Sequence, residues 1–146
     1  MKNAILFIDD DAGRVENDVY ELRSCGFEVH LEQSVENAFR FFDDNCNELV
    51  AVISDIMMPH GETVTSEESV DGLRTGLVVF RRVRSRCPDL PFIFFTNVTT
   101  VDDALRKHIE SNERSCLYLE KRHYLSNEFA GRVKEFLTDE RQHHPV

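Results

Sequence analysis

Five polar side chains that could do chemistry each follow, or end, an apolar stretch of the sequence. Asp9 and Asp10 follow the first such stretch, Asp55 follows the third, Thr96 ends the fourth and Lys121 lies just after the fifth. If these stretches are parallel strands of one sheet, their carboxyl ends line a common crevice. The pattern therefore predicts one site that combines carboxylates, a hydroxyl and an amine.

This combination indicates a divalent cation and a phosphate. Crowded carboxylates repel one another, and Mg²⁺ relieves that repulsion because it is a hard ion that prefers oxygen ligands and keeps several waters. Phosphoryl transfer depends on positioning and on neutralising the phosphoryl oxygens, which a metal, a lysine and a hydroxyl can do together. We expect Asp55, at the centre of this set, to be the phosphoryl acceptor.

The hydrophobic pattern predicts the elements that must position these side chains. Short apolar stretches are typical of buried strands, and the intervening segments repeat apolar residues at helical spacing. We predict strands at 4–8, 27–31, 49–54, 91–95 and 116–119, and helices around 15–22, 35–42, 77–84, 101–109 and 125–136. Because parallel neighbours need crossover connections, this alternation predicts an α/β fold, a doubly wound five-stranded parallel sheet with five helices.

Length and composition limit how the chain is organised. A chain of 146 residues with 41% hydrophobic content suits a single domain. We assign that domain to residues 1–138 and expect the polar segment 139–146 to be a disordered tail. The four cysteines form no C-x-x-C pair, which argues against a zinc or redox motif and predicts reduced thiols.

Charge and hydropathy argue against several kinds of partner. The formal net charge of -10 repels nucleic-acid phosphates and anionic membrane surfaces, so we expect no direct nucleic-acid binding. No apolar stretch approaches the roughly 20 residues that cross a bilayer, and the start of the sequence lacks a signal-peptide pattern. We therefore expect a cytoplasmic protein without membrane contact.

The whole pattern resembles the receiver domain of response regulators, the CheY-like superfamily of two-component signalling. The pair Asp9-Asp10, the motif Asp55-Ile56-Met57-Met58-Pro59, Thr96 and Lys121 match the family's conserved elements in order and location, and the resemblance covers about residues 5–137. It implies a phosphoryl acceptor that is supplied by a histidine kinase or histidine phosphotransfer protein. Such a domain signals by binding a downstream protein target or by homodimerising, and it is not an enzyme beyond its own phosphorylation and dephosphorylation.

The resemblance also implies a metal site. Asp10 and Asp55 would ligate Mg²⁺ together with the backbone carbonyl of Met57, while Asp9 would assist through a water molecule. No other cofactor is implied.

The remaining roles concern the phosphoryl group and its effect on the surface. Thr96 would bind a phosphoryl oxygen, and Lys121 would pair with the phosphoryl group. Tyr118 lies where the family has its aromatic switch residue, so rearrangement of Thr96 and Tyr118 would reshape a neighbouring face.

Two features depart from the family pattern. Arg122 follows Lys121, where the family usually has a proline. An insertion at 60–75 separates Pro59 from the glycine that opens the next helix, which we take to be Gly76 rather than Gly72. This polar, acidic insertion could be a lid, a determinant of partner choice or a tolerated loop.

Two other functions compete with a working receiver. A small haloacid-dehalogenase-like phosphatase would use Asp9 and Asp11 as its D-x-D pair, but that interpretation leaves the motif at Asp55 unexplained. A degenerate receiver would act as a binding module without phosphorylation, as Arg122 and the insertion suggest. The phosphatase would be phosphorylated on Asp9 and a working receiver on Asp55. A degenerate receiver would bind Mg²⁺ weakly or not at all, unlike a working one.

Overall fold

A computed structural model describes residues 2–62, 64–65, 74–97 and 115–143 and contains one sheet. Its five strands are all parallel and lie in the order β2-β1-β3-β4-β5. The strands are β1 Ala4–Ile8, β2 Glu28–Glu32, β3 Leu49–Ser54, β4 Phe92–Thr96 and β5 Cys116–Glu120. The predicted five-stranded parallel sheet is confirmed.

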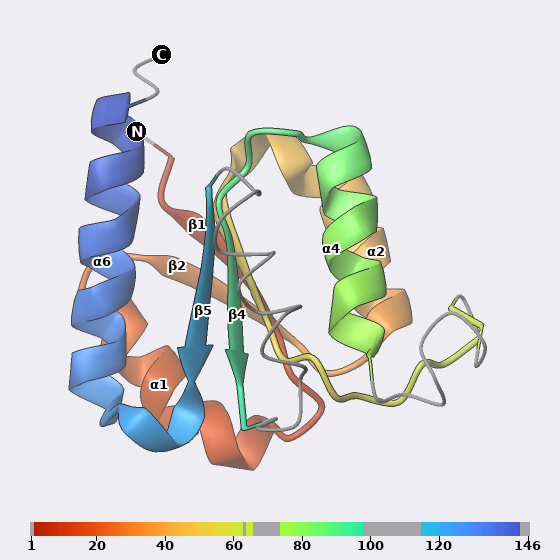
Figure 1. Ribbon diagram of the computed structural model, residues 1–146, viewed down its shortest axis with the longest axis horizontal. Helices are drawn as coiled ribbons and strands as arrows, with labels where there is room; N and C mark the ends of the chain where they lie inside the picture. Colours follow the sequence, from red (N-terminus) through yellow and green to blue (C-terminus); the bar gives the residue numbers. More distant parts are fainter. Residues whose placement is uncertain (1, 63, 66–73, 98–114, 144–146) are drawn as a thin grey trace.

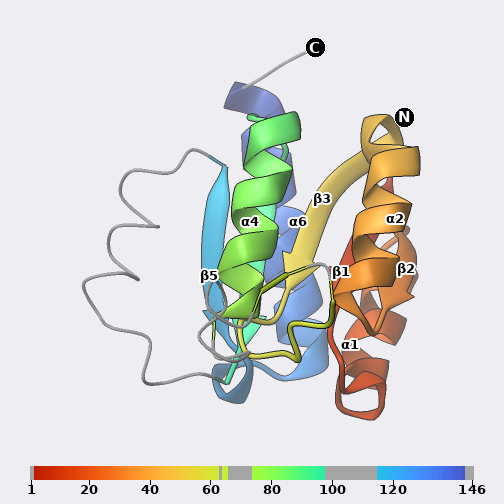
Figure 2. The same ribbon diagram turned by 90° about the vertical axis from the view of Figure 1, so that its right-hand side faces the viewer.

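Helices cover both faces of this sheet. In the described part of the chain these are α1 Ala12–Ser24, α2 Val35–Asn45, α4 Thr75–Arg86 and α6 Ser126–His143, with short 3₁₀ helices η1 Cys46–Glu48 and η2 Lys121–His123. Helices α1 and α6 lie on one face and α2 and α4 on the other (Figures 1 and 2). The helix predicted at 101–109 falls outside the described residues. No helix among those described is long and apolar enough to cross a membrane.

Local sequence signals explain where these elements begin and end. Every residue of β1 and β4 is buried, as expected for strands covered on both faces. The Ser34 hydroxyl caps α2 by accepting the N–H of Asn37 at 3.2 Å, which satisfies a backbone donor of the first turn. Gly26 ends the α1 segment with φ at +96°, a conformation that glycine adopts without steric cost.

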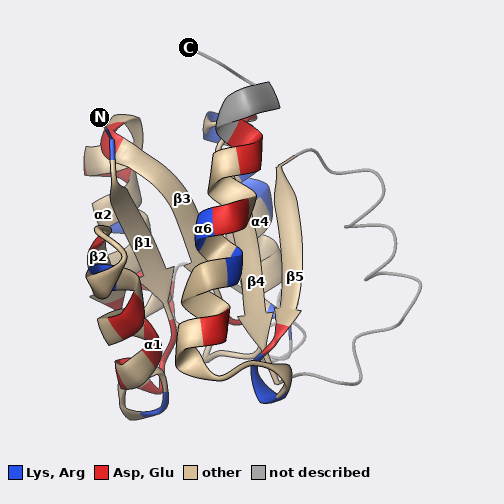
Figure 3. Ribbon diagram, turned by 90° about the vertical axis from the view of Figure 1, so that its left-hand side faces the viewer, with Lys and Arg blue, Asp and Glu red and all other residues tan. Residues whose placement is uncertain are grey.

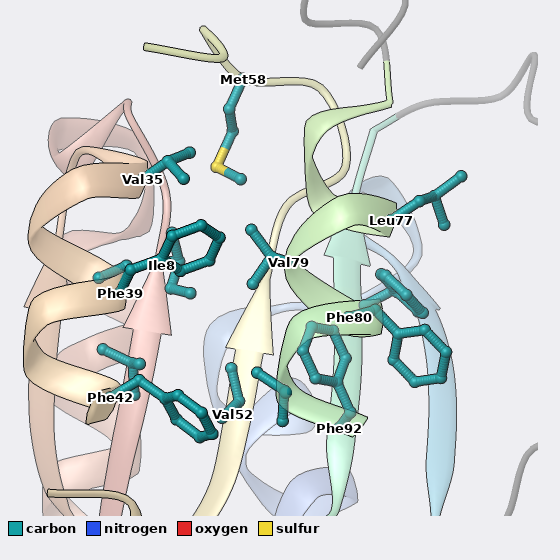
Figure 4. Close-up of a cluster of buried hydrophobic side chains, with 14 of the residues drawn as sticks. Ile8, Val35, Phe39, Phe42, Val52, Met58, Leu77, Val79, Phe80 and Phe92 are labelled. Carbon is teal, nitrogen blue, oxygen red and sulfur yellow. The ribbon is translucent and has the colours of Figure 1, made fainter. Parts of the chain in front are cut away.

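Two hydrophobic clusters hold the layers together, one on each face of the sheet. The cluster under α2 and α4 includes Phe39, Phe42, Val79 and Phe80. In Figure 4 the first three lie between the two helices, and Phe80 lies on the other side of α4, where its ring is 5.1 Å from that of Phe92. The cluster on the other face joins α1 and α6 to the sheet. The carboxyl ends of the strands are thus held in place from both sides.

The C-terminal helix is longer than the sequence pattern predicted. We expected a disordered tail from residue 139, but α6 continues through residue 143, so that expectation is wrong for 139–143. The side chain of Glu140 accepts a hydrogen bond from the Ser115 hydroxyl, which fixes this part of the helix against the start of β5. Glu140, Arg141 and Gln142, whose polarity suggested a solvated tail, are also good helix formers.

Candidate functional site

The carboxyl ends of four neighbouring strands bring the predicted side chains together. Asp9 follows β1, Asp55 follows β3, Thr96 is the last residue of β4, and Lys121 follows β5. These strands are adjacent and parallel, so the four positions lie along one edge of the sheet. The predicted clustering is present.

Asp55 lies at the centre of a hydrogen-bonded network. Its Oδ1 accepts the Thr96 hydroxyl at 2.6 Å and the Ile56 backbone N–H at 2.7 Å. The Lys121 Nζ lies 3.0 Å from Asp55 Oδ2 and 2.6 Å from Asp9 Oδ2, so the amine bridges two carboxylates. One hydroxyl and one ammonium group therefore lie on opposite oxygens of the Asp55 carboxylate.

The charged groups of this network interact strongly because they are largely buried. The Asp9 side chain is fully buried, whereas those of Asp55 and Lys121 are 13% and 12% exposed. Burial raises the pKa of Asp9, although the ammonium of Lys121 opposes this effect. Burial alone would lower the pKa of Lys121, but the Asp55 and Asp9 carboxylates outweigh it and the pKa is raised. Lys121 therefore remains a cation at neutral pH.

The carboxylates form a group that fits a divalent cation. One oxygen each from Asp9, Asp10 and Asp55 lies within 4.8 Å of the others, and Asp10 is exposed to solvent. Oxygen ligands with an open, solvated side suit Mg²⁺, which holds only a few protein ligands and keeps several waters. The Met57 side chain is 45% exposed on the loop after β3. Its carbonyl as a ligand stays a prediction.

Asp11 lies beside the site and has a different set of contacts. It is the N-cap residue of α1, but its side chain makes no capping hydrogen bond. Its backbone N–H instead donates to Asp9 Oδ1 at 2.9 Å, and its carboxylate lies 3.8 Å from Arg14 on the surface. Both oxygens of Asp9 are therefore occupied, one by Asp11 and one by Lys121.

The start of α4 supports the loop that carries Asp55. The Gly76 N–H donates to the Ile56 carbonyl at 2.8 Å, and the Thr75 hydroxyl donates to the Met58 carbonyl at 2.6 Å. Gly76 is thus the close-packed glycine, and Gly72 lies outside the described residues. Thr75 was not predicted as a site residue. Its buried position at the start of a helix is visible only in the structure.

The two residues near the end of β5 differ in environment. Tyr118 is 5% exposed and belongs to the cluster under α4, with its ring 6.3 Å from that of Phe94. Arg122 lies in η2, where its guanidinium is 3.2 Å from Glu120. Figure 3 shows a basic stretch directly after β5, at the carboxyl edge of the sheet. The switch role of Tyr118 stays a prediction.

The first residues of the insertion pack onto α2. Val64 is buried in the cluster under α2 and α4. The His60 ring nitrogen Nδ1 is 2.7 Å from the Gly61 carbonyl and 3.0 Å from the Val64 carbonyl, and the Glu62 N–H donates to Glu36 of α2. Both partners of His60 are acceptors, so Nδ1 carries the proton. The first residues of the insertion are therefore anchored to α2, whichever of the three predicted roles holds.

Comparisons with known proteins agree on the fold. No family model and no curated protein matches the sequence. A CheY-like receiver domain protein from Methanospirillum hungatei JF-1 is 17% identical, with a TM-score of 0.72 over 98% of this chain and 99% of that one. A putative response regulator from Chloroflexus aurantiacus J-10-fl is 26% identical, with a TM-score of 0.69 over 94% and 99%. A receiver domain protein from Clostridium thermocellum is 22% identical, with a TM-score of 0.69 over 95% and 97%.

The chain has the fold of a CheY-like response regulator receiver domain over nearly its whole length. The resemblance stated from the motifs is therefore confirmed at the level of the fold. A receiver fold supports a receiver role in two-component signalling.

Proposed function

We propose that this protein is a phospho-accepting receiver that takes a phosphoryl group onto Asp55. The observation that carries the proposal is the Asp55 carboxylate, which lies between the Thr96 hydroxyl at 2.6 Å and the Lys121 ammonium at 3.0 Å. The adjacent acidic group of Asp9 and Asp10 adds the oxygens that a divalent cation needs. Few other reactions require a carboxylate, an amine, a hydroxyl and a metal in one place.

Each side chain has a task in the transfer. A carboxylate oxygen of Asp55 forms a bond to phosphorus while the P–N bond to a donor imidazole breaks, and the imidazole takes up a proton from solvent. Lys121 stays protonated and pairs with the incoming negative charge, and the Thr96 hydroxyl can turn from Asp55 to a phosphoryl oxygen. Asp10, Asp55 and the Met57 carbonyl would hold Mg²⁺, with Asp9 assisting through a water molecule, and the ion would supply charge neutralisation when bound.

Accessibility favours Asp55 over Asp9 as the acceptor. The Asp9 side chain is fully buried. Asp55 retains exposed area and is the carboxylate that a donor can reach. This observation supports the receiver over the phosphatase that would use Asp9 and Asp11.

The proposed role is cytoplasmic signalling through other proteins. A histidine kinase or a histidine phosphotransfer protein would supply the phosphoryl group, and a downstream protein target would read the phosphorylated state. The region 1–138 would be the functional receiver domain.

Intact mass spectrometry after incubation with acetyl phosphate tests the proposal. With Mg²⁺, the wild type should gain the mass of one phosphoryl group, and omission of Mg²⁺ should prevent the gain. Asp55→Asn should abolish the adduct, whereas Asp11→Asn, which changes a neighbouring surface carboxylate, should retain it. An adduct that survives Asp55→Asn would favour the phosphatase, and no adduct at all would favour a degenerate binding module.

A further inference from the structure

The loop after β3 carries both Asp55 and the carbonyl that we predict to ligate Mg²⁺. Its start is tied to β1, because the Asp55 backbone N–H donates to the Ile8 carbonyl at 3.1 Å. Further along, the Met58 side chain is buried in the cluster under α2 and α4, whereas the Met57 side chain is exposed. One side of this loop therefore faces the core and the other faces solvent.

The first two residues of α4 bind the carbonyls on either side of Met57. The Gly76 N–H donates to the Ile56 carbonyl at 2.8 Å. The Thr75 hydroxyl donates to the Met58 carbonyl at 2.6 Å. Within the described part of the chain, no group donates a hydrogen bond to the Met57 carbonyl between them. The Met57 carbonyl is thus left for a ligand, while α4 holds its two neighbours.

A proline makes the hydrogen bond from Thr75 important for the loop. The peptide group between Met58 and Pro59 has no N–H, so the Met58 carbonyl is its only polar group. The ring of Pro59 also fixes the φ angle on that side, which leaves rotation about the Met58 Cα–C bond as the main freedom. The fully buried Thr75 side chain restricts this rotation. Because adjacent peptide planes share the Met58 Cα, the same contact limits how the Met57 carbonyl can turn.

We propose that Thr75 is a positioning residue that sets the affinity for Mg²⁺ through the Met57 carbonyl. The inference rests on the proposed function, because that function makes this carbonyl a metal ligand together with Asp10 and Asp55. Thr75 is not itself a ligand, and it acts by holding the peptide group beside one. Loss of a group that orients a metal ligand typically weakens metal binding by about 10–100-fold. Since Thr75 acts one peptide group away from the ligand, we expect a loss of about 10-fold.

One labelled peptide bond allows the Met57 carbonyl to be observed directly. The chain has three methionines, and Met57-Met58 is the only consecutive pair. Protein grown with methionine that is isotopically labelled at the carbonyl carbon and the amide nitrogen therefore gives a single carbonyl–amide cross-peak by NMR. A Mg²⁺ titration at constant ionic strength then measures the Kd and shows whether this carbonyl responds to the ion. We expect the wild-type cross-peak to shift as Mg²⁺ binds.

Three substitutions separate positioning from stability. Thr75→Val removes the hydroxyl and keeps the shape of the side chain, so it should raise the Kd for Mg²⁺ about 10-fold. Thr75→Ser keeps the hydroxyl and should bind Mg²⁺ as the wild type does. The matched control Thr138→Val makes the same change in α6, where the Thr138 hydroxyl donates to the Lys134 carbonyl at 2.8 Å. This control should leave the Kd unchanged.

Thermal melting shows whether each variant is folded. If Thr75→Val is unfolded at the temperature of the titration, Thr75→Ala and Thr75→Ser form the comparison, because these two differ only in the hydroxyl. Thr75→Ala should then show the weaker binding of Mg²⁺.

Three outcomes would overturn the inference. The first is a folded Thr75→Val protein with a lower Tm and the Kd of the wild type, as a purely structural role would give. The second is an equal loss of affinity in Thr75→Ser. The third is a wild-type cross-peak that stays in place while calorimetry shows that Mg²⁺ binds. A wild type that neither binds Mg²⁺ nor gains a phosphoryl group would instead remove the proposed function, and this inference with it.

Discussion

The substitution Gly76→Ala tests the contact between α4 and the loop that carries Asp55. A Cβ at this position would lie 2.1 Å from the Asp55 carbonyl oxygen and 2.6 Å from the Ile56 Cα. Both are backbone atoms that cannot rotate away, so the helix or the loop must move by about 1 Å to restore an ordinary separation. That movement also strains the hydrogen bond from the Gly76 N–H to the Ile56 carbonyl.

The cost can be estimated from these contacts. Overpacking against a rigid neighbour costs about 1–3 kcal/mol, and weakening one buried hydrogen bond adds about 1 kcal/mol. The better helix propensity of alanine returns less than about 1 kcal/mol. We therefore expect Gly76→Ala to lose about 3 kcal/mol, which corresponds to a Tm lower by about 9 °C.

Gly131→Ala is the matched control, because it makes the same change where there is room. Gly131 lies within α6, and a Cβ there would have nothing within 4 Å. Alanine should then stabilise the helix by about 0.5–1 kcal/mol and raise Tm by about 2 °C. Thermal melting followed by circular dichroism measures both variants. A Gly76→Ala protein that melts at or above the wild type would refute the close approach of α4 to the acceptor loop.

Three further substitutions and one ligand test the site and its supports. Lys121→Met should destabilise the protein by about 3 kcal/mol at neutral pH, because the buried Asp9 loses its cation. The pKa of Asp9 is already raised by burial and should rise further without Lys121, so the loss should shrink as the pH falls through that raised pKa; a loss independent of pH in denaturant unfolding would contradict this. Burial raises the pKa of Asp18 from 3.8, so between these two pKa values the folded state binds more protons than the unfolded state. The free energy of unfolding of the wild type should therefore fall as the pH rises through this interval. The Tm of Asp18→Asn relative to the wild type should therefore rise as the pH increases from 3.8 through the raised pKa of Asp18, and a constant difference in a melting series would count against it. Ser34→Ala should lower stability by about 1 kcal/mol through loss of the α2 cap, as measured by chemical denaturation. Mg²⁺ at a concentration of about ten times its Kd should raise the free energy of unfolding by about 1.4 kcal/mol. An equal stabilisation of Asp10→Asn at the same Mg²⁺ concentration would argue against the proposed metal ligands.

The fold was predictable because most strands are covered on both faces. The stretches at Ala4–Ile8 and Leu49–Ser54 are continuous apolar runs, and the structure has strands with the same bounds. The edge strand β2 and the buried strand β4 each begin and end one residue later than predicted, so the pattern located these strands but not their exact bounds. The end of α6 was mispredicted for a related reason. Charged residues are compatible with both a tail and a helix, and the contact from Ser115 to Glu140 joins residues far apart in sequence.

The members of the site could be named from the sequence because each lies where a strand ends. The individual contacts of these residues could not be predicted from the sequence. The sequence does not show that Lys121 bridges Asp9 and Asp55, or that Asp9 is the buried member of the acidic group. The same limit applies to Asp11, because an aspartate just before a helix commonly caps it with its side chain. The structure instead uses its backbone N–H to hold Asp9.

The contacts that escaped prediction are those that depend on the order of strands in the sheet. Asp43 and Arg86 are far apart in sequence, and their contact follows from α2 and α4 lying side by side on one face (Figure 2). The approach of Gly76 to Asp55 arises in the same way, because α4 must return across the sheet directly behind the acceptor loop. Both contacts involve α4, the helix that follows the insertion. The insertion can lengthen the connection from β3 to α4 without disturbing the acceptor, because Gly76 and Thr75 fix one end of α4 and Asp43 fixes the other.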